Sequence, residues 1–292
     1  MTDLNLELDH TGVAVRDLDV GQAAYQRLGF TLTPRSFHFG SRTAGGPVEK
    51  WGSGNHCAMF EDGYLEIIGI TDSNLYSSTQ DYLDRYEGSH IVACGSGDAD
   101  ASYPILNSRF KGVNPATKLQ RQAAFGPNND ETRLAAFRNI SIDRENFPEA
   151  KLIFIDHLTR DVLWQPHLLS HPNGAVGLAE VALCVPDADV TCGRLSKLFD
   201  RQPKDIMPGV ASFALDRGNI YVMEEAGLSG WAPGVKPPCV PYVASFGVAV
   251  KDLEATRNYL AANDIATTDH PYHALWVAPE YTCGPIVSFI QA

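Results

Sequence analysis

The chain has 292 residues, enough for two domains of ordinary size, and its 44% hydrophobic and 20% charged residues are typical of a globular protein. A net charge of −12, without a run of Lys or Arg, argues against nucleic acids and anionic membranes as partners. The chain starts with no recognisable secretory signal, contains no membrane-length apolar segment, and has six scattered cysteines without a CxxC pair. We therefore expect a cytoplasmic protein with reduced thiols.

A pattern of one strand, one helix and three strands opens the chain. An apolar strand starts at His10, and Asp17 follows seven positions later as a good N-cap for a helix over 20–28. Gly29 is a natural C-cap for this helix. The three strands are predicted at 31–39, 56–61 and 64–70. This βαβββ unit is the first of four.

The second unit is fainter than the others. Its strand starts at His90, and either Asp98 or Asp100 could cap a helix over 101–110. Three strands follow at 119–125, 133–142 and 151–157. The spacing from His90 to the cap is not seven, so the pairing with the first unit is less regular.

The third and fourth units repeat the seven-residue spacing. Glu180 precedes Asp187 and a helix over 190–199, and Ser245 precedes Asp252 and a helix over 253–262. Their strands are predicted at 201–207, 210–215, 220–224, 266–270, 275–278 and 286–291. A polar turn cluster at 165–174 separates the halves. We predict two domains, 1–165 with the active site and 172–292 as a structural support.

Three stretches resemble the vicinal oxygen chelate superfamily, and more narrowly its glyoxalase-like members. They are LDHTGVAVRDL from Leu8, WGSGNHCAMFEDGYLEIIG from Trp51 and LWQPHLLSHPNGA from Leu163. The resemblance implies an α+β fold in which four βαβββ modules pair into two cupped mixed-sheet domains. Glyoxalases, bleomycin resistance proteins and dihydroxybiphenyl dioxygenases share this arrangement.

The resemblance also implies a divalent metal ion in the cup, held by the first and last strands of paired units. It transfers the ligand role to His10, Glu66 and His90, with a further residue from Asp156 or His157. Fe, Mn, Zn, Ni and Co all suit nitrogen and oxygen ligands. The C-terminal equivalents are Glu180, Tyr221, Ser245 and Val287. Because only Glu180 is a usual ligand type, we expect the C-terminal half to be metal-free.

Glu66 lies in the apolar strand 64–70, opposite Leu65 and Ile67, so it needs a partner if it is buried. A metal ion or substrate is one partner, and an Arg or Tyr is the alternative. Glu66 and His157 are the candidate catalytic residues. His56, Trp51 and Tyr64 are candidates for substrate binding.

The alternatives for these residues are structural. His10 could be a satisfied strand histidine, His56 could mark a strand entry, and the aromatic residues could belong to the core. His167 and His171, in the turn between the halves, are expected to be solvated.

Three functions fit these observations. The first is a metal-dependent lyase or isomerase that acts on a small oxygenated metabolite through a metal-stabilised enolate. The second is an extradiol-type ring-cleavage dioxygenase. The third is a metal-free protein that binds a small molecule, as resistance proteins do. A homodimer is compatible with each.

Overall fold

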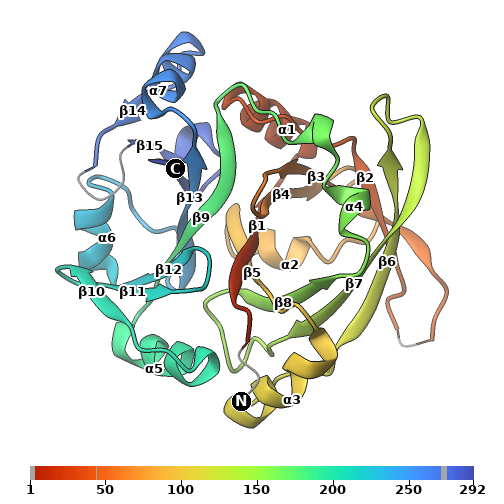
Figure 1. The fold of residues 1–292 in the computed structure, drawn as a ribbon, viewed down its shortest axis with the longest axis horizontal. Helices are drawn as coiled ribbons and strands as arrows, with labels where there is room; N and C mark the ends of the chain where they lie inside the picture. Colours follow the sequence, from red (N-terminus) through yellow and green to blue (C-terminus); the bar gives the residue numbers. More distant parts are fainter. Residues whose placement is uncertain (1–3, 44, 271–274) are drawn as a thin grey trace.

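The structure, a computed structural model, describes residues 4–43, 45–270 and 275–292. One βαβββ unit recurs four times along the chain (Figure 1). The first unit contains β1 (Glu7–Val15), α1 (Leu18–Arg27), β2 (Ser36–Gly40), β3 (Glu49–Met59) and β4 (Tyr64–Ile70). The second contains β5 (Gly88–Gly95), α3 (Ala99–Arg109), β6 (Thr117–Phe125), β7 (Glu131–Ser141) and β8 (Lys151–His157).

The third and fourth units have shorter outer strands. The third contains β9 (Ala175–Cys184), α5 (Ala188–Phe199), β10 (Lys204–Met207), β11 (Val210–Ala214) and β12 (Asn219–Met223). The fourth contains β13 (Tyr242–Val250), α7 (Leu253–Ala262), β14 (Thr267–Thr268), β15 (Leu275–Val277) and β16 (Ile286–Gln291). Short helices connect the repeated elements: α2 (Gln80–Leu83), α4 (Arg160–Leu163), α6 (Glu225–Trp231) and two 3-10 turns (Pro166–Leu168 and Pro279–Tyr281).

Each long helix starts at an aspartate, as the sequence predicts. The carboxylates of Asp17, Asp98, Asp187 and Asp252 accept backbone N–H groups of the first helical turn. These bonds satisfy donors that have no partner within the helix. Asp98, and not Asp100, caps the helix of the second unit.

Several strands differ from the prediction. Strand β2 begins at Ser36 and β10 at Lys204, later than the predicted 31 and 201. Strand β3 begins at Glu49, ahead of the predicted 56, because its glycines accommodate a close backbone: a Cβ on Gly52 would lie 2.2 Å from the carbonyl oxygen of Asp72. The predicted strand 266–270 is shorter, with β14 at Thr267–Thr268.

The strands form two half-sheets that meet along their central strands. In each unit the first strand runs parallel to the last, and β1 pairs antiparallel with β5 as β9 does with β13. The N-terminal order is β2-β3-β4-β1-β5-β8-β7-β6, and the C-terminal order is β10-β11-β12-β9-β13-β16-β15-β14. Val243 pairs with Ser89 between β13 and β5, and isolated bridges also join the halves, at Glu7–Arg217 and Asp62–Gly177. The predicted α+β fold class is confirmed. The N-terminal half-sheet curls on the right of Figure 1.

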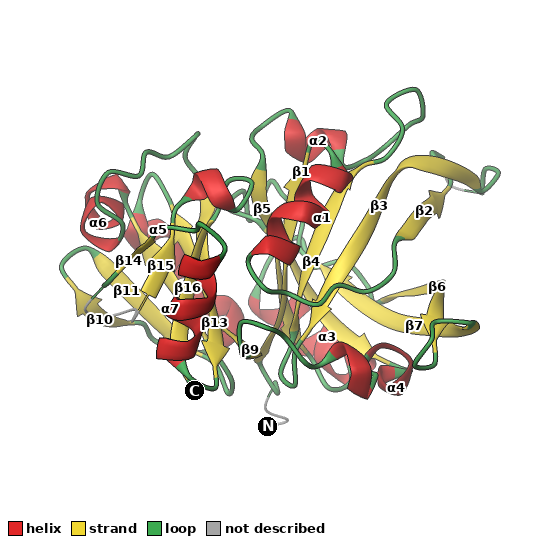
Figure 2. Ribbon diagram, turned by 90° about the horizontal axis from the view of Figure 1, so that it is seen from above, coloured by secondary structure: helices red, strands yellow, loops and turns green. Residues whose placement is uncertain are grey.

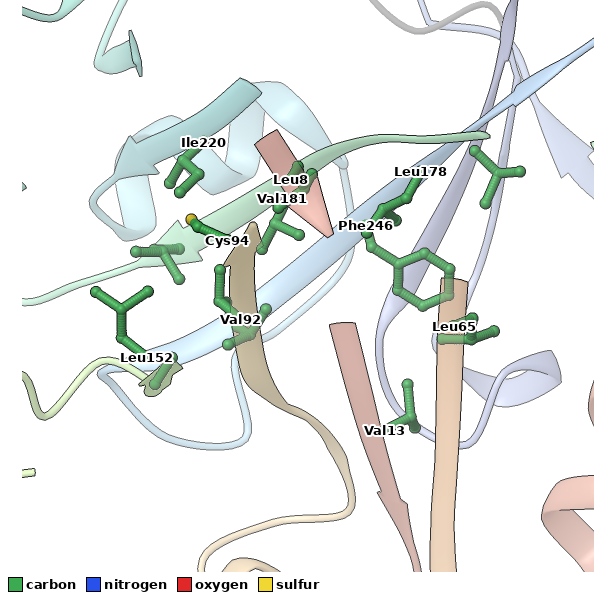
Figure 3. Packing of buried hydrophobic residues seen from close by; sticks show 14 of the residues in the cluster. Leu8, Val13, Leu65, Val92, Cys94, Leu152, Leu178, Val181, Ile220 and Phe246 are labelled. Carbon is green, nitrogen blue, oxygen red and sulfur yellow. The ribbon is translucent and has the colours of Figure 1, made fainter. Parts of the chain in front are cut away.

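The two half-sheets share one hydrophobic core. Side chains from the first and last strands of all four units meet there, including Val13, Leu65, Val92, Leu178 and Phe246 (Figure 3). Figure 2 shows α1 and α7 lying alongside the sheets of their own halves. The inner faces of the two half-sheets point away from this core. Because the core is continuous, the domain boundaries at 165 and 172 stay a prediction.

Within the described part of the chain, no helix is long and apolar enough to span a membrane.

Candidate ligand site on the inner face of the N-terminal sheet

Alternation along β4 separates the two faces of the N-terminal sheet. Leu65 and Ile67 belong to the shared core, whereas Tyr64 and Ile68 belong to clusters on the inner face. Glu66, between them in this alternation, therefore points to the inner face, as the sequence predicts. The end strands of this half approach each other across that face, since Arg121 Nη1 on β6 donates to Ser36 Oγ on β2 over 3.0 Å.

Glu66 has a direct partner in the neighbouring strand. The side-chain amide of Asn55 on β3 donates to Glu66 Oε1 over 2.7 Å. His38 on β2 lies nearby, and its Nδ1 is 3.0 Å from Ser53 Oγ. Burial lowers the pKa of His38, the negative charge of Glu66 raises it, and the positive charge of Arg121 lowers it. The predicted carboxylate thus lies in a set of polar groups that includes a cation.

A second polar cluster is centred on Asp9. The Asp9 carboxylate is 2.7 Å from His10 Nδ1 and 3.1 Å from His157 Nε2. Burial by itself would raise the pKa of Asp9, but the hydrogen bonds and charges of His10 and His157 together lower it. Asp9 is therefore ionised at neutral pH and fixes the orientation of both imidazoles.

Tyr64 links the two clusters. Its ring stacks on His10, with centroids 4.3 Å apart, and contacts His157 and Trp164 edge-on. Burial raises the pKa of Tyr64 well above its ordinary value, and the charges of Asp9 and Glu66 add to this effect. The structure therefore brings together four predicted residues along the inner face: His10, Tyr64, Glu66 and His157.

His90 lies elsewhere. Its ring stacks between Tyr86, at 3.8 Å, and Tyr82, at 5.0 Å, and its Nε2 is 2.9 Å from the carbonyl oxygen of Tyr86. Burial lowers the pKa of His90 to about 4. None of its contacts within the described residues involves His10 or Glu66, so the predicted three-ligand set is not assembled.

Strand register explains the position of His90. The pairing of β1 with β5 shifts between Gly12–Ile91 and Val13–Ser89, which leaves His90 as an extra residue in the strand. Ile91 then lies seven residues before the cap at Asp98, just as His10 lies seven before Asp17. Ile91, not His90, is thus the structural equivalent of His10.

The same register identifies the residue of β8 that corresponds to Glu66 of β4. Glu66 pairs with Gly12, two residues after His10, and Ile153 pairs with Ala93, two residues after Ile91. Ile153 is therefore the counterpart of Glu66, and His157 lies four residues further along β8. His157 nevertheless points inward, while Asp156 accepts the N–H of Ala99 at the start of α3.

His56 and Trp51 do not join the cluster. His56 faces the opposite side of β3, where its Nδ1 is 2.8 Å from the carbonyl oxygen of Thr33 and its ring approaches Arg35. Trp51 lies at the far end of β3 from Tyr64, and its indole donates to the carbonyl oxygen of Gly40. The predicted substrate contacts of these two residues are therefore not supported by their positions.

The expectation that His171 is solvated is wrong. Its Nδ1 accepts the backbone N–H of Thr31, its Nε2 is 2.8 Å from the carbonyl oxygen of Met59, and the residue is buried. His171 therefore anchors the turn between the halves to the N-terminal sheet.

The equivalent positions of the C-terminal half are all polar. By the same register they are Glu180, Tyr221, Ser245 and Ser288. Ser288 replaces the predicted Val287, whose side chain belongs to the shared core. Leu228 and Trp231 of α6 pack in one cluster with residues of β9, β13 and β16, so this half covers its inner face with its own helix.

The described residues do not fit a metal ion. No group of three or more His, Cys, Asp or Glu within them is placed to hold one. In the N-terminal half two of the four equivalent positions are Ile91 and Ile153, whose side chains donate no electron pair to a metal. Glu66 already accepts the Asn55 amide and has Arg121 as a nearby positive charge.

Sequence reasoning missed Asp9, His38, Asn55 and Arg121. Asp9 had a usable signal, since a carboxylate beside His10 in an apolar strand needs a partner. Asn55 and Glu66 belong to strands that are adjacent along the chain, and their pairing depends on the register of a hairpin. Arg121 lies on the strand at the opposite end of the half-sheet from β2. No local sequence pattern predicts that these two end strands come together.

The comparisons agree with this architecture. The chain belongs to the glyoxalase-like domain family, which it matches over residues 8–199. No curated protein sequence matches it. The predicted membership of the vicinal oxygen chelate superfamily is thereby confirmed.

Three solved structures share the fold at low identity. A hypothetical protein from Staphylococcus aureus is 14% identical, with a TM-score of 0.59 and 98% and 100% of the two chains covered. A mutant of 4-hydroxymandelate synthase from Streptomyces coelicolor is 10% identical, with a TM-score of 0.58 and coverage of 99% and 93%. A xylose isomerase-like TIM barrel/4-hydroxyphenylpyruvate dioxygenase fusion protein is 12% identical, with a TM-score of 0.57. The match covers 99% of this chain and 48% of the fusion protein.

Proposed function

We propose that this chain binds a small oxygenated molecule on the inner face of its N-terminal sheet, and that protein side chains, not a metal ion, hold it. The observation that carries the proposal is the environment of Glu66. Its carboxylate accepts the Asn55 amide over 2.7 Å and lies near the positive charge of Arg121. A carboxylate compensated in this way needs no metal ion to offset its burial.

The repeat supports this reading. The second unit supplies Ile91 and Ile153 where the first supplies His10 and Glu66. A metal site shared between paired units would need donor atoms from both. Among the three functions that fit the sequence, the metal-free binding protein is therefore the one that this donor set favours.

Metal analysis of the purified protein tests the proposal. We expect less than stoichiometric Fe, Mn, Ni, Co and Zn, and a melting temperature that none of these ions changes. Stoichiometric metal that is lost in both His10→Ala and Glu66→Gln would overturn the proposal. His56→Ala is the matched control, because His56 lies on the opposite face of the same sheet.

An oxygenase is the second candidate. It is favoured by the likeness of the fold to 4-hydroxymandelate synthase and to a fusion protein that contains a 4-hydroxyphenylpyruvate dioxygenase. Catalytic roles of Glu66 and His157 belong to the enzyme hypotheses. Oxygen uptake with a catechol or an aryl keto acid in the presence of added Fe(II) would favour this candidate over the binding protein.

A further inference from the structure

The inner face of the N-terminal sheet has a polar side and an apolar side. The polar side comes mostly from the first unit, with Ser36, His38, Asn55 and Glu66. The apolar side comes from the second unit, where Ile91, Ile153, Ile155 and Phe137 belong to one cluster. This asymmetry follows from the register, because the positions that carry His10 and Glu66 in one unit carry isoleucines in the other.

Arg121 is the cation of this face. It lies on the same face of β6 as Leu119 and Ala123, because these residues are two positions apart. Ala123 belongs to the same inner cluster as Tyr64. Its side chain bonds to the neutral hydroxyl of Ser36, and it has no ion pair among the residues that the structure describes. A guanidinium presents a fork of N–H donors that matches a carboxylate, and one hydroxyl acceptor leaves most of that fork available.

The accessible residues of the face lie around this fork. Glu66, His38 and Arg121 are all partly exposed, whereas Asn55 and Tyr64 behind them are buried. Leu119, two residues from Arg121, is 50% exposed and pairs across the sheet with the half-buried Phe137. A partly exposed apolar pair therefore lies next to the Arg121 cation.

Resting on the proposed function, we infer that the ligand is a small hydroxy acid with an apolar body. Its carboxylate pairs with the Arg121 guanidinium, and its hydroxyl donates to Glu66. Its apolar body covers Leu119 and Phe137. A neutral molecule would offer no carboxylate to the remaining N–H donors of Arg121, and a dicarboxylate would place its second charge against Glu66 or against the apolar side.

Calorimetric titration with three related probes tests this inference. The probes are phenyllactate, its methyl ester, which lacks the charge, and hydrocinnamate, which lacks the hydroxyl. We expect phenyllactate to bind the wild type about tenfold or more tightly than the ester, since a charge-assisted bidentate contact is lost in the ester. The affinity of hydrocinnamate should lie between those of phenyllactate and the ester.

Variants assign the contacts. Arg121→Gln should weaken phenyllactate by about tenfold or more and leave the ester unchanged. Glu66→Gln should remove the advantage of phenyllactate over hydrocinnamate. Lys118→Gln is the matched control, because it removes one positive charge from the exposed side of the same strand. Melting curves establish that each variant is folded.

Equal binding of acid and ester, an equal effect of Lys118→Gln, or no binding of any probe up to its solubility limit would overturn the inference. These outcomes are separate from failure of the proposed function, which would be seen as stoichiometric metal at His10 and Glu66.

Discussion

His90 illustrates how one residue can satisfy a sequence pattern and still lie outside the site. It starts an apolar strand, as His10 does, but the shifted pairing of β1 with β5 makes it an extra residue. Its side chain is enclosed by Tyr82 and Tyr86 and is 2% exposed. The sequence predicts the strand, but a single extra residue in a strand has no reliable local signal.

The enclosed ring should make stability depend on pH. Burial lowers the pKa of His90 to about 4 in the folded protein, so the unfolded chain binds the proton first. The contribution of neutral His90 is present above its unfolded pKa of about 6.5 and is lost as pH falls towards 4, by about 3 kcal/mol. His90→Phe keeps an aromatic ring between the two tyrosines without a titrating group.

Urea unfolding at a series of pH values measures this effect. The free energy of unfolding of His90→Phe should fall less steeply than that of the wild type between pH 6.5 and 4. Parallel curves for the two proteins would show that His90 does not contribute to the pH dependence.

At the scale of elements, the helices were the most predictable part of the chain. Their aspartate caps and apolar periodicity are local, and α7 has the predicted bounds of Leu253–Ala262. By contrast, β3 extends back to Glu49 through glycines that permit close backbone contact, which only the folded chain reveals. Arg121 illustrates the same limit at the site, because its contact with Ser36 depends on the curl of the whole half-sheet.

The caps allow a matched test at this scale. Asp187 accepts the backbone N–H of Val190 over 2.9 Å, whereas Asp189 lies in the first turn of the same helix without capping it. We expect Asp187→Ala to lower the free energy of unfolding by about 1 kcal/mol. Asp189→Ala keeps the cap and should lower the free energy of unfolding by less, because it removes only the favourable interaction of the Asp189 charge with the helix dipole. Equal losses in urea unfolding would contradict a specific role of the cap.

At the scale of the whole molecule, the two halves are not independent in their packing. Val13 and Leu65 from the N-terminal half share a core with Leu178 and Phe246 from the C-terminal half. We predict that a fragment of residues 1–165 exposes this surface and unfolds without a cooperative transition, whereas coexpression with residues 172–292 restores a single cooperative melt. A sharp melting transition of the isolated fragment would instead establish it as an autonomous domain.

The fourfold repeat allows the residues at equivalent positions of the four units to be compared. The paired positions hold His10 with Glu66, Ile91 with Ile153, Glu180 with Tyr221, and Ser245 with Ser288. Copies of one ancestral unit would be free to diverge in this way because the shared core depends on the alternate residues of the same strands. The polar and apolar sides of the inner face follow from this difference: the first unit has ionisable groups at these positions, and the second has hydrocarbon side chains.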